Sequence, residues 1–219
     1  MTNEGNQKFG RLKAIFDEDG AKIREQFIYA GLLLTIFERF KTYVIDRVDE
    51  FFSTHVEVRN GSLKYIRGSE FKNFIKKYGS GLPGQHNNQV FRTALHWIQS
   101  LNAISKDDLV EIERLYSLRN EVGHEMLLIL ADDNKKPITF YDVLLTYSVY
   151  VRIVRWWWKE IECATDPDMT QEKHDSIDWD NIESTDTMIL REILNKSLSD
   201  NPIWQNLQTM GQEAAESQS

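Results

Sequence analysis

Residues 21–52, AKIREQFIYAGLLLTIFERFKTYVIDRVDEFF, decide the fold. Apolar side chains recur along this stretch at steps of three and four residues, which predicts one long amphipathic helix. The side chains that set the period are Ile23, Phe27, Ala30, Leu34, Phe37, Val44, Val48 and Phe51. At 1.5 Å per residue the helix would be about 45 Å long, with a mild break at Lys41. A helix of that length in a chain of 219 residues must pack against several others or against a second subunit.

The rest of the chain is also mainly helical in its pattern. Apolar periodicity predicts further helices over residues 69–78, 87–101, 105–131, 140–162 and 185–198. Between residues 55 and 67, Asn60-Gly61 separates two short β-prone runs, which is a strong hairpin signal. The sequence therefore predicts an all-α fold with a small inserted β-hairpin.

Charge divides the chain into two parts. The net charge is −8, but residues 160–219 hold 3 basic and 14 acidic side chains, which leaves 23 basic and 20 acidic ones in residues 1–159. We therefore expect a helical domain over 1–163 and an acidic C-terminal extension over 164–219, with one short helix and a disordered tail.

The single cysteine, Cys163, cannot form an intramolecular disulfide, which favours a reducing, cytoplasmic location. No stretch is apolar enough for a membrane span or a signal peptide.

A locally basic segment lies inside the first part. Its cations are Arg59, Lys64, Arg67, Lys72, Lys76 and Lys77, and Glu70 is the one acidic residue among them. A basic surface on an acidic protein is compatible with RNA contact, so these six are candidate RNA-binding residues. An ordinary solvated face is the alternative.

The hexapeptide Arg119-Asn120-Glu121-Val122-Gly123-His124 is the most suggestive stretch for chemistry. An arginine can bind a phosphate, and a histidine can transfer protons near neutral pH. Arg119 interrupts the apolar stripe of its predicted helix, and a charge in such a position needs a partner. Asn120 and His124 are four residues apart and share one helix face, whereas Arg119 lies about 140° from His124 on an ideal helix.

The Arg-Asn-x-x-x-His pattern resembles the R-x(4–6)-H signature of HEPN (higher eukaryotes and prokaryotes nucleotide-binding) domains, with Arg119, Asn120 and His124 at the matching positions. The helical setting is similar too, over roughly residues 20–163. The resemblance implies a HEPN-like antiparallel helical bundle that forms a homodimer, with both motifs lining one cleft. It implies a metal-independent endoribonuclease of a bacterial toxin or antiphage defence system, without a cofactor and with an antitoxin or defence-system protein as partner.

Under this resemblance Arg119 and His124 would be catalytic, and Asn120 would orient the substrate or His124. The motif supplies only one histidine, His124, in each chain, which is too few for both an acid and a base. Two copies across a two-fold axis would supply a pair. The alternative is a non-catalytic helical module that dimerises or binds a partner protein or a nucleotide. In that case Arg119 would pair with a carboxylate such as Glu121 or one from another helix. The other histidines show no metal-ligand spacing, so no metal site is expected.

Overall fold

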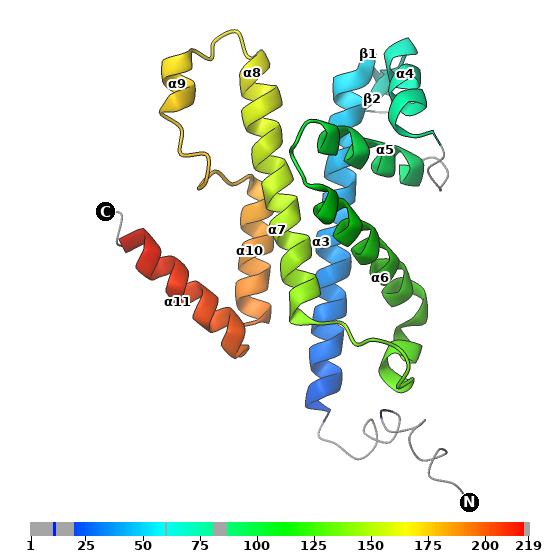
Figure 1. Cartoon of the computed structure of the whole chain (residues 1–219), viewed down its shortest axis with the longest axis vertical. Helices are drawn as coiled ribbons and strands as arrows, with labels where there is room; N and C mark the ends of the chain where they lie inside the picture. The colour runs from blue at the N-terminus through cyan, green and yellow to red at the C-terminus, as the bar shows by residue number, and fades with distance from the viewer. Residues whose placement is uncertain (1–10, 12–19, 60, 81–86, 217–219) are drawn as a thin grey trace, which may run out of the picture. The chain divides into compact units, whose positions relative to one another are not determined.

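The structure is a computed structural model that describes residue 11 and residues 20–59, 61–80 and 87–216. The described residues are mostly helical and contain one small antiparallel sheet of two strands, which confirms the predicted all-α class with a hairpin (Figure 1). The first elements are α3 (Ala21–Phe52), β1 (Ser53–Arg59), β2 (Ser62–Arg67), α4 (Ser69–Tyr78), α5 (Asn87–Ser100), α6 (Lys106–Ala131) and α7 (Phe140–Trp157). They are followed by η1 (Trp158–Glu162), α8 (Cys163–Thr165), α9 (Gln171–Asp175), α10 (Thr185–Ser197) and α11 (Pro202–Glu216).

The long helix α3 is the centre of the first compact unit, which ends at Ile153. Phe37 and Phe40 are fully buried, and the ring of Phe40 contacts Phe91 of α5 and Tyr150 of α7, with centroids 5.4 and 6.0 Å apart. Burial of such large apolar side chains is the main stabilising contribution to a helical bundle. The expected break at Lys41 is absent, because α3 is helical throughout.

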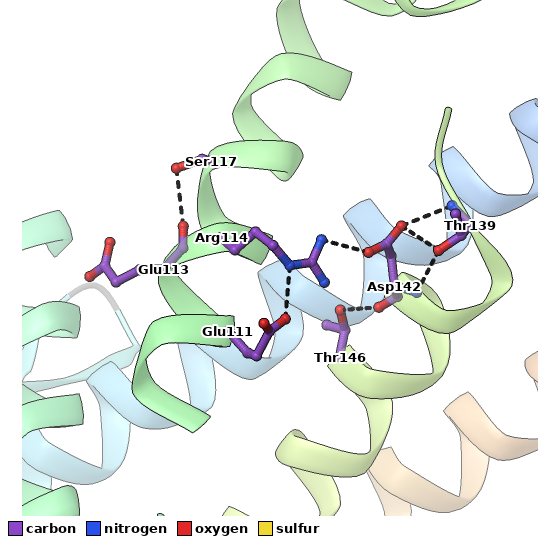
Figure 2. Close-up of polar contacts among 7 residues, drawn as sticks. All are labelled: Glu111, Glu113, Arg114, Ser117, Thr139, Asp142 and Thr146. Atoms are coloured by element: carbon purple, nitrogen blue, oxygen red, sulfur yellow. Dashed lines mark hydrogen bonds and ion pairs between the residues drawn. The ribbon is translucent and has the colours of Figure 1, made fainter. Parts of the chain in front are cut away.

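Helices α6 and α7 are joined by a polar network (Figure 2). Arg114 of α6 donates a hydrogen bond of 2.7 Å to the buried carboxylate of Asp142 in α7. The same carboxylate accepts hydrogen bonds from the backbone N–H of Thr139 at 2.9 Å and from its hydroxyl at 2.6 Å. The Thr139 hydroxyl also accepts a hydrogen bond from the N–H of Asp142 and so caps the first turn of α7. Asp142 connects that turn to α6.

The predicted hairpin forms at the C-terminal end of α3. β1 and β2 pair in antiparallel register, with Val56 opposite Tyr65 and Glu57 opposite Lys64. Gly61 has a φ of +77°, a conformation that glycine adopts without steric cost, and it lies in the predicted turn. Asn60, the other turn residue, is outside the described residues.

The second compact unit covers Val154–Ser219. The sequence predicts a boundary at 163/164, followed by one short helix and a disordered tail. Instead, α9 and α11 accompany the predicted helix α10, and α11 extends to Glu216. Asn201 explains the start of α11, because its side-chain oxygen accepts hydrogen bonds from the N–H groups of Ile203 and Trp204 at 3.0 and 3.1 Å.

No helix among the described residues combines the length and the apolar character needed to cross a lipid bilayer.

Candidate functional site

The Arg119–His124 motif lies in the second half of α6, as predicted. This helix begins with a complete capping box: Ser105 accepts from the N–H of Asp108 at 3.0 Å, and Asp108 accepts from the N–H of Ser105 at 2.8 Å. Buried Leu115 and Val122 keep one face of α6 in the core. Arg119 falls between them and is only partly exposed.

Arg119 is bound by a carboxylate from another helix, one of the two kinds of partner that the sequence predicted. Its Nη2 forms an ion pair with Oε1 of Glu38 in α3, and its Nη1 donates a hydrogen bond of 2.9 Å to Oδ1 of Asn120. Glu121, the other predicted partner, is exposed and lies 3.6 Å from Lys135 Nζ. The structure therefore brings Arg119 and Asn120 together and adds Glu38 to them.

Lys41 is a second cation at this place. Its Nζ donates a hydrogen bond of 2.7 Å to Asn88 and lies 5.6 Å from the ring centre of Tyr116. Burial lowers the pKa of Lys41, and Glu38 opposes that effect, whereas the charges of Arg119 and Arg92 add to it. Lys41 thus belongs to the same electrostatic environment as the Arg119–Glu38 pair.

His124 stands apart from this cluster. Its side chain is exposed, and within the described part of the chain it has neither a hydrogen bond nor an ion pair. Helix α6 departs from helical geometry at the next residue, Glu125, which has φ −128° and ψ 24°. A Cβ placed on Gly123 would meet nothing within 4 Å, so the surface beside His124 is open. The irregularity of α6 thus lies one residue after His124.

The end of α6 beyond this irregularity is held by two basic residues. Lys135 Nζ pairs with Glu125 at 2.7 Å. The guanidinium of Arg11 donates to the carbonyl oxygens of Ile129, Asp132 and Lys135 at 3.2, 3.3 and 2.7 Å. A cation at the C-terminal carbonyl groups of a helix is favourable, so Arg11 stabilises the end of α6 that follows the irregularity.

The six candidate RNA-binding residues do not share one environment. Arg67 forms two hydrogen bonds with Asp49, at 2.8 and 2.7 Å, so its charge is neutralised within the chain. Four of the others are Lys64, Lys72, Lys76 and Lys77, which are exposed and make no ion pair within the described part of the chain. The side chain of Arg59 lies outside the described part.

Glu38 and Lys41 are the members of the cluster that the sequence-based set omitted. Both interrupt the apolar side of α3, between Phe37 and Val44, and they are three residues apart. Opposite charges at that spacing are neighbours on a helix surface. Arg119 was predicted because it interrupts an apolar stripe. Glu38 and Lys41 interrupt the apolar stripe of α3 in the same way and could have been predicted on that ground.

Chemically, the cluster offers donors for an anion and, one turn away, a group that can transfer a proton. Arg119, Lys41 and Asn120 supply cationic and amide donors, and His124 supplies an accessible imidazole. Within the described ranges, no group of three or more histidine, cysteine, aspartate or glutamate side chains is arranged to hold a metal ion.

No protein-family model matches the chain, and comparisons with curated proteins and with solved structures found no match.

Proposed function

We propose that this chain is a HEPN-type endoribonuclease of a bacterial toxin or antiphage defence system, which cleaves RNA without a metal ion. The observation that carries the proposal is the contrast within one stretch of α6. Arg119 is partly buried and oriented by Glu38 and Asn120, while His124, five residues later, is exposed and has no partner among the described residues. A positioned guanidinium and a free imidazole suit phosphate binding and proton transfer.

The proposed reaction uses the 2′-hydroxyl of the RNA as nucleophile. A base takes the 2′-hydroxyl proton, and the oxygen forms a bond to the adjacent phosphorus. The bond from phosphorus to the 5′-oxygen of the next nucleotide breaks, and an acid protonates that oxygen. The products are a 2′,3′-cyclic phosphate and a 5′-hydroxyl. Arg119 would stabilise the negative charge that develops on the phosphate oxygens.

Two copies of His124 would supply the base and the acid, which requires a homodimer. His124 lies just before the irregularity at Glu125, and Leu127 and Leu128 lie just after it in α6. Leu127 is 79% exposed and Leu128 is 51% exposed, which is costly for leucines unless another surface covers them. A second copy that covered these two leucines would bring two imidazoles toward one cleft.

The test is cleavage of a labelled RNA by the purified chain in excess chelator. We expect cyclic-phosphate products. His124→Ala should lower the rate constant roughly 10²–10⁴-fold, as expected for loss of a general acid or base. Arg119→Ala should lower it roughly 10²–10³-fold, and Arg119→Lys should restore only part of it, because lysine lacks the planar fork.

Matched controls come from the second unit. His174→Ala and Arg191→Ala remove the same residue types from positions outside α6 and should leave the rate unchanged. Cleavage that survives both His124→Ala and Arg119→Ala, or no cleavage of any RNA by the wild-type chain, would refute the proposal.

A non-catalytic helical module is the second candidate, and one observation favours it. The Arg119–Glu38 pair already satisfies part of the charge of Arg119 within the chain, as a purely structural network would. This alternative predicts that Arg119→Ala destabilises the fold. It also predicts that dimerisation or nucleotide binding occurs without RNA cleavage. The cleavage assay in excess chelator distinguishes this module from the nuclease, because the module would cleave no RNA.

A further inference from the structure

The hairpin and α4 carry four exposed lysines that form no ion pair within the described residues. Elsewhere in the first unit, many basic side chains are paired, for example Arg92 with Glu113 at 2.9 Å and Arg152 with Asp108 at 2.6 Å. By contrast, the lysines of β2 and α4 extend into solvent without an ion pair within the described part of the chain. They are Lys64, Lys72, Lys76 and Lys77. Their charge is available to an external anion.

Aromatic rings pack together where α3, α4 and α5 meet, and one of these lysines contacts a ring. Phe52 stacks on Phe74 of α4 at 4.5 Å and meets Trp97 of α5 edge-on at 5.1 Å. Phe51 adjoins the same cluster, 5.3 Å from the Trp97 ring, and is 45% exposed. At the other end of the cluster, Lys77 Nζ lies 4.8 Å from the ring centre of Tyr78.

The hairpin also exposes apolar side chains, on its other face. Val56 and Val58 are 47% and 72% exposed, but Lys64 lies opposite Glu57 and therefore on the other face of the two strands. The two strands are the only ones in their sheet, so within the described residues each has an unpaired edge. We call the exposed cations Lys64, Lys72, Lys76 and Lys77, together with Phe51, the hairpin–α4 surface.

We propose that the hairpin–α4 surface is an RNA-binding exosite that takes single-stranded RNA at a distance from the cleavage centre. The choice of RNA as ligand rests on the proposed function. Exposed lysines match a chain of phosphates, and the exposed ring of Phe51 matches an unstacked base. A duplex presents its phosphates but hides its bases, so it would use the cations and leave the apolar part of the surface uncovered.

The exosite and the catalytic cluster lie at different positions along α3. Glu38, which holds Arg119, is in the middle of the helix, and the surface begins at its end near Phe52. Fourteen helical residues separate the two, which is about 20 Å. An RNA that contacts both must therefore extend over several nucleotides, so that the exosite favours long substrates over short ones.

Binding is tested separately from cleavage, with the His124→Ala chain in excess chelator and fluorescence anisotropy of labelled RNA. We expect a single strand of about 16 nucleotides to bind more tightly than one of about 4 nucleotides or a duplex of equal length. Substitution of Lys72, Lys76 and Lys77 by Gln should weaken binding of the long strand roughly tenfold. It should also reduce the slope of log affinity against log salt by about 2, since each phosphate contact contributes about 0.7.

The matched control is the triple substitution Lys106→Gln, Lys136→Gln and Lys196→Gln. It removes the same charge from exposed positions outside the hairpin–α4 surface and should leave both affinity and slope unchanged. A Phe51→Leu variant keeps an apolar side chain but loses the aromatic face, and should weaken single-strand binding by about fivefold while duplex binding stays the same.

Three results would overturn the exosite. These are no RNA binding by the chain, an equal loss in the two triple variants, or lysine-dependent binding to phosphatidylserine vesicles in place of RNA. If RNA binds through these lysines but the wild-type chain cleaves nothing, the exosite stands and the proposed nuclease fails. If cleavage is normal while the lysine substitutions leave the affinity for long RNA unchanged, the nuclease stands and the exosite fails.

Discussion

Arg119 and Glu38 form an ion pair between α6 and α3, and the pair leaves part of the guanidinium unused. Nε of Arg119 is buried and makes no hydrogen bond within the described structure. A guanidinium has five donors, of which Glu38 and Asn120 engage only some. Glu38 therefore has two opposing effects on a nuclease site: it orients Arg119, and it competes with a substrate phosphate for the same charge.

Glu38→Gln separates these effects, because glutamine keeps an oxygen acceptor but removes the negative charge. We expect KM for RNA to fall about threefold at low salt, which is the scale of one partly exposed charge pair, with kcat nearly unchanged. Glu38→Ala removes both functions and should lower kcat roughly tenfold or more through misplacement of Arg119. Steady-state cleavage kinetics measure both values.

Glu50→Gln is the control for this pair. Glu50 is also on α3 and accepts a 2.7 Å hydrogen bond from Arg47, but it lies near the helix end. It should alter neither constant. A higher KM in Glu38→Gln would contradict the competition described above.

Leu127→Asp tests the dimer face beside His124. Leu127 is 79% exposed, so the substitution should leave the free energy of unfolding within about 0.5 kcal/mol of wild type. On a dimer face it would bury an unpaired charge, and we expect monomers in analytical ultracentrifugation together with loss of cleavage. Val110→Asp is the control, since Val110 is 67% exposed near the other end of α6. A Leu127→Asp chain that remains dimeric and active would show that the dimer, if formed, uses another surface.

Local patterns in the sequence were sufficient to predict most of the fold. α3 and α4 have the predicted bounds, and α6 begins next to the predicted residue 105, because apolar periodicity and caps depend on neighbouring residues. Phe27 and Phe51 are exposed although they fit the α3 period. Their exposure depends on which side of α3 other helices cover, which no local pattern specifies.

The candidate site was predictable only in part. The motif indicated Arg119, Asn120 and His124 and the need for a carboxylate near Arg119. Glu38 precedes Arg119 by 81 residues in the sequence. Identifying Glu38 as the partner therefore requires knowing that α3 packs against α6. The same limit applies to Arg67, whose pairing with Asp49 depends on how the hairpin folds back toward α3.

Asp142→Ala should cost about 2 kcal/mol of unfolding free energy. The Asp142 side chain is only 7% exposed, and its loss leaves Arg114 and the first turn of α7 without their acceptor (Figure 2). Glu111→Gln is the matched control, because the Glu111 side chain binds the same guanidinium at 2.8 Å but is 40% exposed, and its substitution should cost under about 0.5 kcal/mol. Urea unfolding at constant m value measures both. Equal losses in the two variants would mean that the pairing of α6 with α7 does not depend on burial of Asp142.

Asp108 makes the start of α6 sensitive to acid. Burial raises the pKa of its carboxyl, but hydrogen bonds from Ser105 and Arg152 together outweigh burial and bring the pKa below its usual value. Because the folded chain then binds this proton less tightly than the unfolded chain, the stabilisation is complete above the unfolded pKa of about 3.9 and is lost as the pH falls through the lower folded value. Wild type should therefore exceed Asp108→Asn by about 1 kcal/mol near pH 7, and the difference should vanish near pH 2. Urea midpoints of the two proteins across this range measure it, and a difference that does not shrink in acid would show that the Asp108 charge does not stabilise the helix start.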